Sequence, residues 1–306
     1  MTWLILAFLS AALLGCYDSF KKQALKANAV IPVLFLNTLF SSLIFLPFIV
    51  LSGTGDMLDG TIFHVASGGW EVHRYVVLKA FIVLSSWVLG YFGMKHLPLT
   101  IVGPINATRP VMVLVGALLV FGERLNVWQW VGVLLAVLSF LMLSRSGKKE
   151  GIDFRRDHWI WMIVGAAALG AVSGLYDKYL MAPVESGGVG LDRMLVQSWY
   201  NIYQCAMMLA MLLLLWWPKH HETTPFHWHW SIIGVSLFLS TADFVYFYSL
   251  SLPDAMISIV SMIRRGSVIV SFLFGAAFFH EKNLKAKAFD LALVLLGMIF
   301  LYIGSK

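Results

Sequence analysis

Long apolar runs fill most of this chain, and short polar connectors separate them. Each run is near the length of about 20 residues with which a helix crosses a membrane. Helices are expected because backbone polar groups in lipid must find their hydrogen-bond partners within the segment. The runs cover residues 2–21, 30–52, 75–96, 99–121, 127–145, 158–181, 191–217, 229–250, 254–279 and 285–304. The pattern therefore predicts an all-α integral membrane protein with ten transmembrane helices.

Composition supports a surface that faces lipid. Of the 306 residues, 59% are hydrophobic and only 12% are charged, whereas about a quarter of the residues in a soluble domain are charged. The net charge of +6 would suggest a nucleic-acid partner in a soluble protein. Here the basic residues cluster in the connectors, so no nucleic acid is expected. Cys16 and Cys205 lie within apolar runs and predict neither a disulfide nor a metal site.

The same pattern occurs twice along the chain. The first span ends with GCYD at 15–18, and the sixth contains GLYD at 174–177. The connector LP and an arginine eleven residues later occur in LPLTIVGPINATRP at 97–110 and in LPDAMISIVSMIRR at 252–265. Because GCYD has a counterpart in mid-chain, residues 2–21 are interpreted as a membrane helix, not as a lipoprotein signal.

This repetition predicts the domain organisation. Each copy has five spans, an odd number, so the second copy must cross the membrane in the opposite orientation. We expect one five-helix repeat over 1–146, a charged linker over 147–157 and a second five-helix repeat over 158–306. Many secondary transporters consist of such inverted repeats and bind substrate near the midplane between them.

The stretch GERLNVWQWVGVLLAVLSFLML at 122–143 closes the first half, and FFHEKNLKAKAFDLALVLLGMIFL at 278–301 is its weaker counterpart. With ten spans arranged as five plus five, the chain resembles the EamA family of the drug/metabolite transporter superfamily. The resemblance implies that small metabolites move by alternating access through a central cavity, often as export of amino acids or related compounds.

The first helix departs from the family pattern. Family members usually carry Trp-Gly there, whereas this chain has Tyr17-Asp18, followed by Lys21 and Lys22. The ligand is therefore expected to differ from those of the better-known amino-acid exporters.

Charged side chains at membrane depth are costly, which makes them functional candidates. Two arginines near the middle of their spans could offer forked hydrogen bonds to a carboxylate or phosphate. The alternative is that the arginines pair with buried aspartates and hold helices together. The candidates for proton coupling or for such ion pairs are Asp18, Asp177 and Asp243.

Neutral polar residues extend the candidate site. Gln197, Asn201 and Gln204 recur at helical spacing and line one face of the seventh span, where interhelical hydrogen bonding is the alternative role. Pro104 and Pro110 should bend the fourth span. The predicted substrate-binding or gating residues are Arg109, Arg264, Arg265, Asn106, Tyr17, Tyr176, Gln197 and Asn201.

No catalytic residue, metal site or cofactor is predicted. The histidines at 220, 221, 227 and 229 lie in one connector among tryptophans, which is typical of an interfacial aromatic belt. Glu123 and Glu281 lie at helix ends and are expected to cap or position loops.

The orientation in the membrane stays open at this stage. Thirteen Lys and Arg residues fall in the connectors after odd-numbered spans, and four fall on the other side. The positive-inside rule then places both termini outside the cell, although the family is more often described with its termini inside.

These features predict a secondary active transporter, acting as an exporter, for a small polar metabolite that is anionic or zwitterionic. Its expected partners are the lipid bilayer, this small molecule and a coupling proton, and it would act as a monomer or homodimer. The expected location is a bacterial inner membrane, as a multi-pass protein. The alternatives are a membrane receptor or scaffold without transport, or an intramembrane enzyme. The sequence contains no phosphate-binding loop of the kind that would indicate primary active transport.

Overall fold

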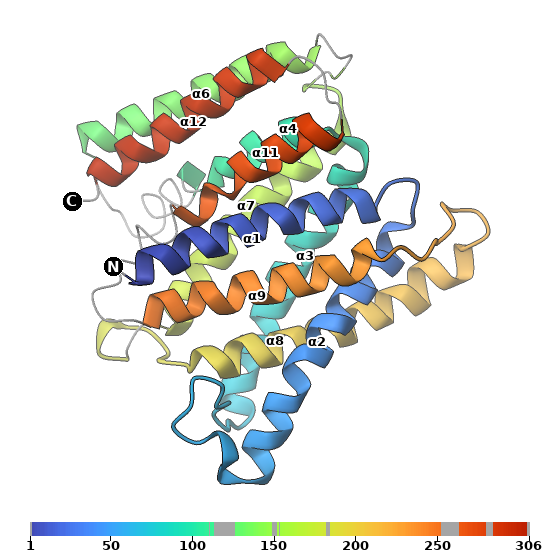
Figure 1. The fold of residues 1–306 in the computed structure, drawn as a ribbon, viewed down its shortest axis with the longest axis vertical. Helices are drawn as coiled ribbons and strands as arrows, with labels where there is room; N and C mark the ends of the chain where they lie inside the picture. The colour runs from blue at the N-terminus through green and yellow to red at the C-terminus, as the bar shows by residue number, and fades with distance from the viewer. Residues whose placement is uncertain are drawn as a thin grey trace.

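The computed structural model describes residues 2–109, 111–112, 126–148, 152, 154–181, 184–251, 263–279 and 284–304. Regular structure in these ranges is entirely helical (Figure 1). The longer helices are α1 (Thr2–Ala24), α2 (Val30–Thr54), α3 (Trp70–His96), α6 (Val127–Lys148), α7 (His158–Met181), α8 (Arg193–Met211), α9 (Ser231–Ser251) and α12 (Leu284–Gly304). The shorter ones are α4 (Leu99–Ala107), α11 (Ser267–Phe278), η1 (Asp56–Leu58), η2 (Val184–Ser186), η3 (Leu212–Trp216) and η4 (Trp217–Lys219).

Seven helical segments of the described chain are long and apolar enough to cross a membrane. They are Thr2–Ala24, Val30–Thr54, Trp70–His96, His158–Met181, Arg193–Lys219, Ser231–Ser249 and Leu284–Gly304. The prediction of an all-helical membrane protein is thus confirmed, whereas ten spans and an inverted repeat stay predictions. Several sequence features lie outside the described residues, namely the GERL motif at 122–125, Pro110, the Leu-Pro pair at 252–253 and Glu281.

Local signals explain where two of these helices begin. Helix α3 starts at Trp70, five residues before the predicted limit, and Glu71 in its first turn favours the positive end of the helix dipole. Helix α8 starts after Asp192, whose side chain accepts a hydrogen bond from the Leu195 amide at 2.8 Å. This is an N-cap, which satisfies one of the free amides of the first turn.

The helices pack in pairs that join the two predicted halves. The most extensive contacts lie between α1 and α9, α6 and α12, α3 and α7, and α2 and α8. In Figure 1, the α6–α12 pair lies along the upper edge, α1 lies beside α9 in the middle, and α2 crosses α8 below. Each pair takes one helix from residues 1–148 and one from residues 158–304. The halves are therefore interleaved and do not form separate bodies.

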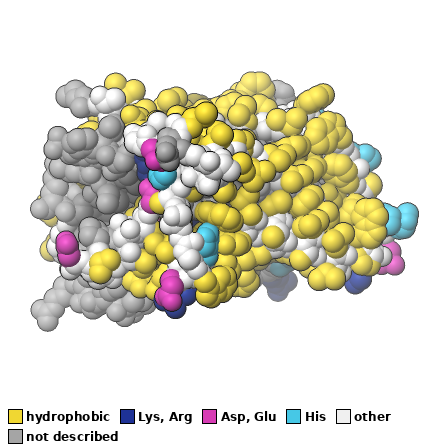
Figure 2. Space-filling view, turned by 90° about the horizontal axis from the view of Figure 1, so that it is seen from below, with side chains coloured by type: hydrophobic (Ala, Val, Ile, Leu, Met, Phe, Trp, Pro, Cys, Tyr) yellow, Lys and Arg dark blue, Asp and Glu magenta, His cyan; other side chains and the backbone are white. Residues whose placement is uncertain are grey.

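Small residues allow close helix contacts. A Cβ atom at Gly93 on α3 would lie 2.5 Å from the Ile163 side chain on α7. Such close approach between backbones is how membrane helices gain packing contacts, since lipid is as apolar as their side chains. Hydrophobic side chains cover much of the face shown in Figure 2, and charged side chains are few on it.

Candidate functional site

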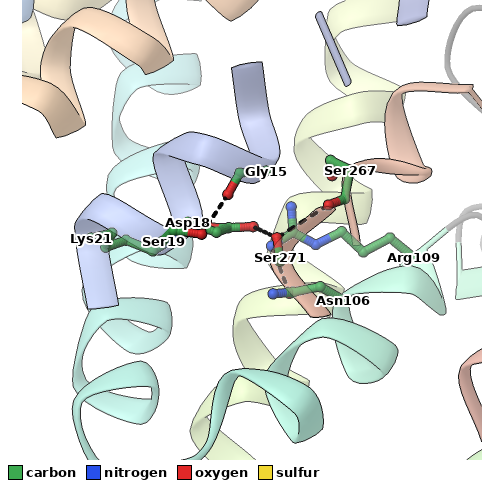
Figure 3. Close-up of polar contacts among 8 residues, drawn as sticks. All are labelled: Gly15, Asp18, Ser19, Lys21, Asn106, Arg109, Ser267 and Ser271. Atoms are coloured by element: carbon green, nitrogen blue, oxygen red, sulfur yellow. Dashed lines mark hydrogen bonds and ion pairs between the residues drawn. The ribbon is translucent and has the colours of Figure 1, made fainter. Parts of the chain in front are cut away.

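Polar side chains from α1, α4 and α11 meet around Arg109, as Figure 3 shows. Arg109 lies two residues beyond the end of α4, and its Nη2 donates a hydrogen bond to Asn106 Oδ1 at 3.1 Å. On the facing helices, Ser271 Oγ donates to Asp18 Oδ2 at 3.2 Å. Lys21 Nζ lies 2.9 Å from the other carboxylate oxygen of Asp18. This set of residues is called the central cluster below.

Helix α7 provides the surface against which the arginine packs. A Cβ atom at Gly170 would lie 2.8 Å from Cζ and Nη1 of Arg109. The guanidinium group therefore occupies the space that any other residue at position 170 would fill. This contact positions the charged end of Arg109 between α4 and α7.

Positive charge exceeds negative charge at this site. Arg109 and Arg265 are half-buried and interact electrostatically with each other, yet within the described ranges neither has a carboxylate within 4.0 Å. The Nε atom of Arg109 is buried and has no hydrogen-bond partner among the residues that the structure describes. Burying a guanidinium group without a close counter-charge is unfavourable.

Arg264 has a different environment. It forms an ion pair with Asp243 on α9, and its Cζ lies 4.2 Å from the centre of the Tyr246 ring. The Tyr200 hydroxyl on α8 donates to the second oxygen of Asp243 at 3.2 Å. The carboxylate of Asp243 is thus bound from two other helices, and it neutralises one of the neighbouring arginines.

The two Gly-x-Tyr-Asp motifs lie in different surroundings. Asp18 contacts Lys21 on its own helix, whereas Asp177 on α7 forms an ion pair with Lys79 on α3. Tyr17 is buried beneath the Lys21 ammonium group, whose nitrogen lies 4.3 Å from the ring centre. Tyr176 is half-buried and donates to the Tyr75 carbonyl at 3.3 Å.

Comparison with known proteins assigns the family. The sequence model of the EamA-like transporter family matches residues 1–145. The first half of the chain belongs to the EamA-like transporter family. The protein is therefore a membrane transporter of the drug/metabolite transporter superfamily. A search of curated protein sequences found no significant match.

A solved structure that is described only as "Crystal structure of protein" has the same fold as this EamA-like transporter. The similarity covers 99% of this chain and 98% of the other, with a TM-score of 0.65 and 12% sequence identity. At this identity the likeness establishes the fold alone. It covers both halves of the transporter, including the half that the family match does not reach.

Two predicted residues of the EamA-like transporter lie on α8, which packs against α2. Asn201 Nδ2 donates to the Gln197 carbonyl at 2.8 Å, and the Asn201 carbonyl accepts from Ser42 Oγ on α2 at 2.9 Å. Neither contact involves the central cluster. The amide group of Gln197 is buried without a hydrogen-bond partner among the described residues.

Sequence reasoning missed several polar residues. Ser271 on α11 gave no signal, because serine is common in apolar helices. Lys287 and Asp290 could have been found, since both charges lie inside the predicted span 285–304. Lys287 is fully buried and donates to Thr100 Oγ1 on α4 at 2.9 Å. Asp290 is also buried, and its carbonyl accepts from Ser139 on α6 at 2.6 Å.

The histidine-rich connector of the EamA-like transporter lines a hollow. Its walls come from Trp216, His220, His221, Thr223, Pro225 and Phe226. Nowhere in the described part of the chain do three His, Cys, Asp or Glu side chains form a group that could hold a metal ion.

Proposed function

We propose that the chain is a secondary active transporter that exports a small anionic or zwitterionic metabolite, such as an amino acid or a related compound. Its two five-helix repeats would alternate access to a cavity beside α1, α4, α7 and α11. The observation that carries the proposal is the half-buried Arg109, which packs on Gly170, donates to Asn106 and has no carboxylate within 4.0 Å among the described residues. Asp18 interacts with its charge only at longer range.

A substrate carboxylate or phosphate would complete this site. The guanidinium group of Arg109 can donate two parallel hydrogen bonds to such a group. Arg265 adds a second positive charge nearby. Asp18, the carboxylate of the central cluster, already pairs with Lys21. The substrate would thus supply the negative charge that Arg109 and Arg265 lack, and this compensation favours binding over an empty site.

The Arg264–Asp243 ion pair offers a means of coupling transport to a proton gradient. When Asp243 binds a proton, its carboxyl group becomes neutral and its attraction for Arg264 falls. Arg264 is then free to bind the anionic part of the substrate. Loss of the proton restores the ion pair and favours release.

Ligand-induced thermal stabilisation of the purified protein tests the proposal. The probes are amino acids, organic acids, nucleosides and sugar phosphates. A ligand present at about 100 times its Kd stabilises the folded state by about 2.7 kcal/mol and raises Tm. We expect an anion or zwitterion to raise Tm in the wild type, and Arg109→Ala to abolish the effect.

Arg74→Ala is the matched control. Arg74 is an exposed arginine in the first turns of α3, 3.7 Å from Glu71, and lies outside the central cluster. This variant should keep the full ligand-induced shift. A full shift in Arg109→Ala would contradict the assigned site.

A further inference from the structure

A strip of buried polar side chains lies where α2 packs against α8 and α9, and we call it the polar seam. Its members are Asn37, Ser41, Ser42, Gln197, Asn201, Gln204, Ser236 and Ser240, and none is more than 6% exposed. On α8 and α9 they recur three or four residues apart, so on each of these helices they share one face. On α2, Asn37 and Ser41 lie toward α9, and the adjacent Ser42 lies toward α8. The seam is therefore a polar interface between these three helices.

Three contacts fix the order of these residues along the seam. Ser236 Oγ donates to the Asn37 carbonyl at 3.2 Å, and Ser240 Oγ donates to Ser41 Oγ at 3.2 Å. Ser42 Oγ donates to the Asn201 carbonyl at 2.9 Å. One helical turn beyond Ser240, Asp243 accepts the hydrogen bond from Tyr200. The seam therefore ends at the ion pair of Asp243 with Arg264.

The other end of the seam points to one membrane face. Helices α2 and α9 both begin there, because the connectors that precede them are hydrogen-bonded to each other. The Asn28 side chain donates to the His227 carbonyl at 2.7 Å and accepts from the His227 amide at 2.9 Å. Asp243 lies 12 residues into α9, which is a depth of about 18 Å at the rise of an α-helix. The seam itself begins at Ser236, five residues into α9, and covers about 10 Å of this depth before it reaches Asp243.

Several amide groups in the seam lack protein partners. The side-chain nitrogen and oxygen of Asn37, Gln197 and Gln204 are all buried without a hydrogen bond in the described structure. The same holds for the hydroxyl of Ser198 beside them. Buried polar groups in native proteins are almost always satisfied, and bound water is the usual partner when protein groups are not.

We propose that the polar seam holds a file of water molecules that carries the coupling proton between this membrane face and Asp243. The proposal rests on the transport function above and assigns the route that this function needs. A proton passes along the waters to one carboxylate oxygen of Asp243, and the resulting neutral carboxyl no longer holds Arg264. No other reactant is needed, because bulk water supplies and accepts the proton.

The charged and titratable groups around Asp243 suit this role. Arg264 and Tyr200 contact it directly, and Tyr246 on the same helix faces Arg264. Farther groups that interact electrostatically with Asp243 or with these residues are Arg109, Arg265, Tyr17 on α1, Asp177 on α7 and Lys79 on α3. Proton uptake would remove one negative charge here and leave the cations available to an anionic substrate.

Silver-ion accessibility of engineered thiols tests for water in the seam. Silver ions are small enough to follow a water file and react with thiols. Ser240→Cys is made in a Cys16→Ala/Cys205→Ala background. Ser86→Cys is the matched control, because Ser86 is equally buried and its hydroxyl donates to the Ala166 carbonyl between α3 and α7, outside the seam.

We expect silver to protect Ser240→Cys from later maleimide labelling on the order of tenfold faster than Ser86→Cys, because a thiol reacts only where the reagent reaches it. Protection should occur from one membrane face, and Asn37→Leu should slow it. Equal rates in Ser240→Cys and Ser86→Cys would overturn the proposal.

Radiolytic labelling of the wild-type protein also tests for water in the seam and needs no substitution there. Radicals formed from bound water oxidise adjacent side chains, so Met208, one turn from Gln204, should be oxidised faster than the equally buried Met94 on α3. Equal oxidation would count against the water file. Neither measurement involves substrate. If water is found in the seam and Arg109→Ala keeps the full ligand-induced Tm shift, the proposed substrate site is refuted and the proposed water file is not.

Discussion

At the scale of single residues, glycine positions decide where charges can lie. Gly170 and Gly174 are one turn apart on α7. Only Gly170 contacts the guanidinium group of Arg109, while a Cβ atom at Gly174 would have no heavy atom within 4 Å. Alanine substitutions at the two positions therefore distinguish the effect of an added methyl group on helix stability from its effect on the position of Arg109.

Gly170→Ala should move Arg109 away from Asn106. The guanidinium is the end of a flexible side chain, so we expect a change in unfolding free energy within about 1 kcal/mol. Anion binding should weaken about tenfold, or about 1.4 kcal/mol. Ligand-induced Tm shifts measure the binding, and melting without ligand measures the stability.

Gly174→Ala is the control for that variant. A methyl group in open space on a helix should stabilise the protein by about 0.5–1 kcal/mol and leave anion binding unchanged. Equal loss of binding in both variants would show that Gly170 does not position Arg109.

At the scale of helices, the two halves contact each other through a few close approaches and ion pairs. Gly15 on α1 packs directly on α11, since a Cβ atom there would lie 2.4 Å from Val270 Cβ and 2.9 Å from the Ser267 carbonyl oxygen. Lys79 and Asp177 join α3 to α7, with their side chains 4% and 29% exposed.

Gly15→Ala should force α1 away from α11, because one of the two contacted atoms belongs to the backbone. Overpacking of this kind costs about 1–3 kcal/mol, which thermal melting would detect. The corresponding position in the second motif is Gly174, where alanine meets open space. Comparable stability of Gly15→Ala and Gly174→Ala would contradict the close approach of α1 and α11.

Lys79→Met should destabilise the protein by leaving Asp177 without its cation. A fully buried pair costs about 3–5 kcal/mol to break, and the partial exposure of Asp177 lowers the expected loss to about 1–3 kcal/mol. The double variant Lys79→Met/Asp177→Asn should recover part of this loss. Additive effects in this double-mutant cycle, measured by melting, would argue against an energetic link between α3 and α7.

At the scale of the whole molecule, the pairing of helices fits two interleaved units. Each of the first five predicted spans has a counterpart in the second five, so that α1 corresponds to α7, α2 to α8, α3 to α9 and α6 to α12. Exchanging counterparts turns the pair α1–α9 into the pair α7–α3. The pairs α2–α8 and α6–α12 stay the same under this exchange. This is the arrangement expected for an inverted repeat. The start of α1 and the end of α12 lie on the same side of the bundle in Figure 1.

Reporter fusions would determine the orientation of this bundle. The count of basic residues places the connector at 146–157 in the cytoplasm and the termini outside. Alkaline phosphatase, which is active only outside the cytoplasm, should therefore be active when fused after residue 306 and inactive when inserted at 150. The reverse pattern would refute the charge count and agree with the orientation usual in the family.

The sequence by itself determined the membrane class, the approximate limits of most described helices and the family. These follow from residue type and periodicity along one helix, because lipid demands apolar surface and internally satisfied backbones. The paired motifs were also visible, since they recur at matching positions in the two halves.

Only the tertiary structure decided which residues meet. Asp18 contacts Lys21 and Ser271, whereas Asp177 contacts Lys79, although the two motifs look alike in sequence. Likewise, spacing placed Gln197 and Asn201 on one face of α8 but could not tell that this face meets α2. Such contacts depend on how each helix is rotated and how deep it lies against its neighbours. Side-chain packing between segments far apart in sequence sets that arrangement.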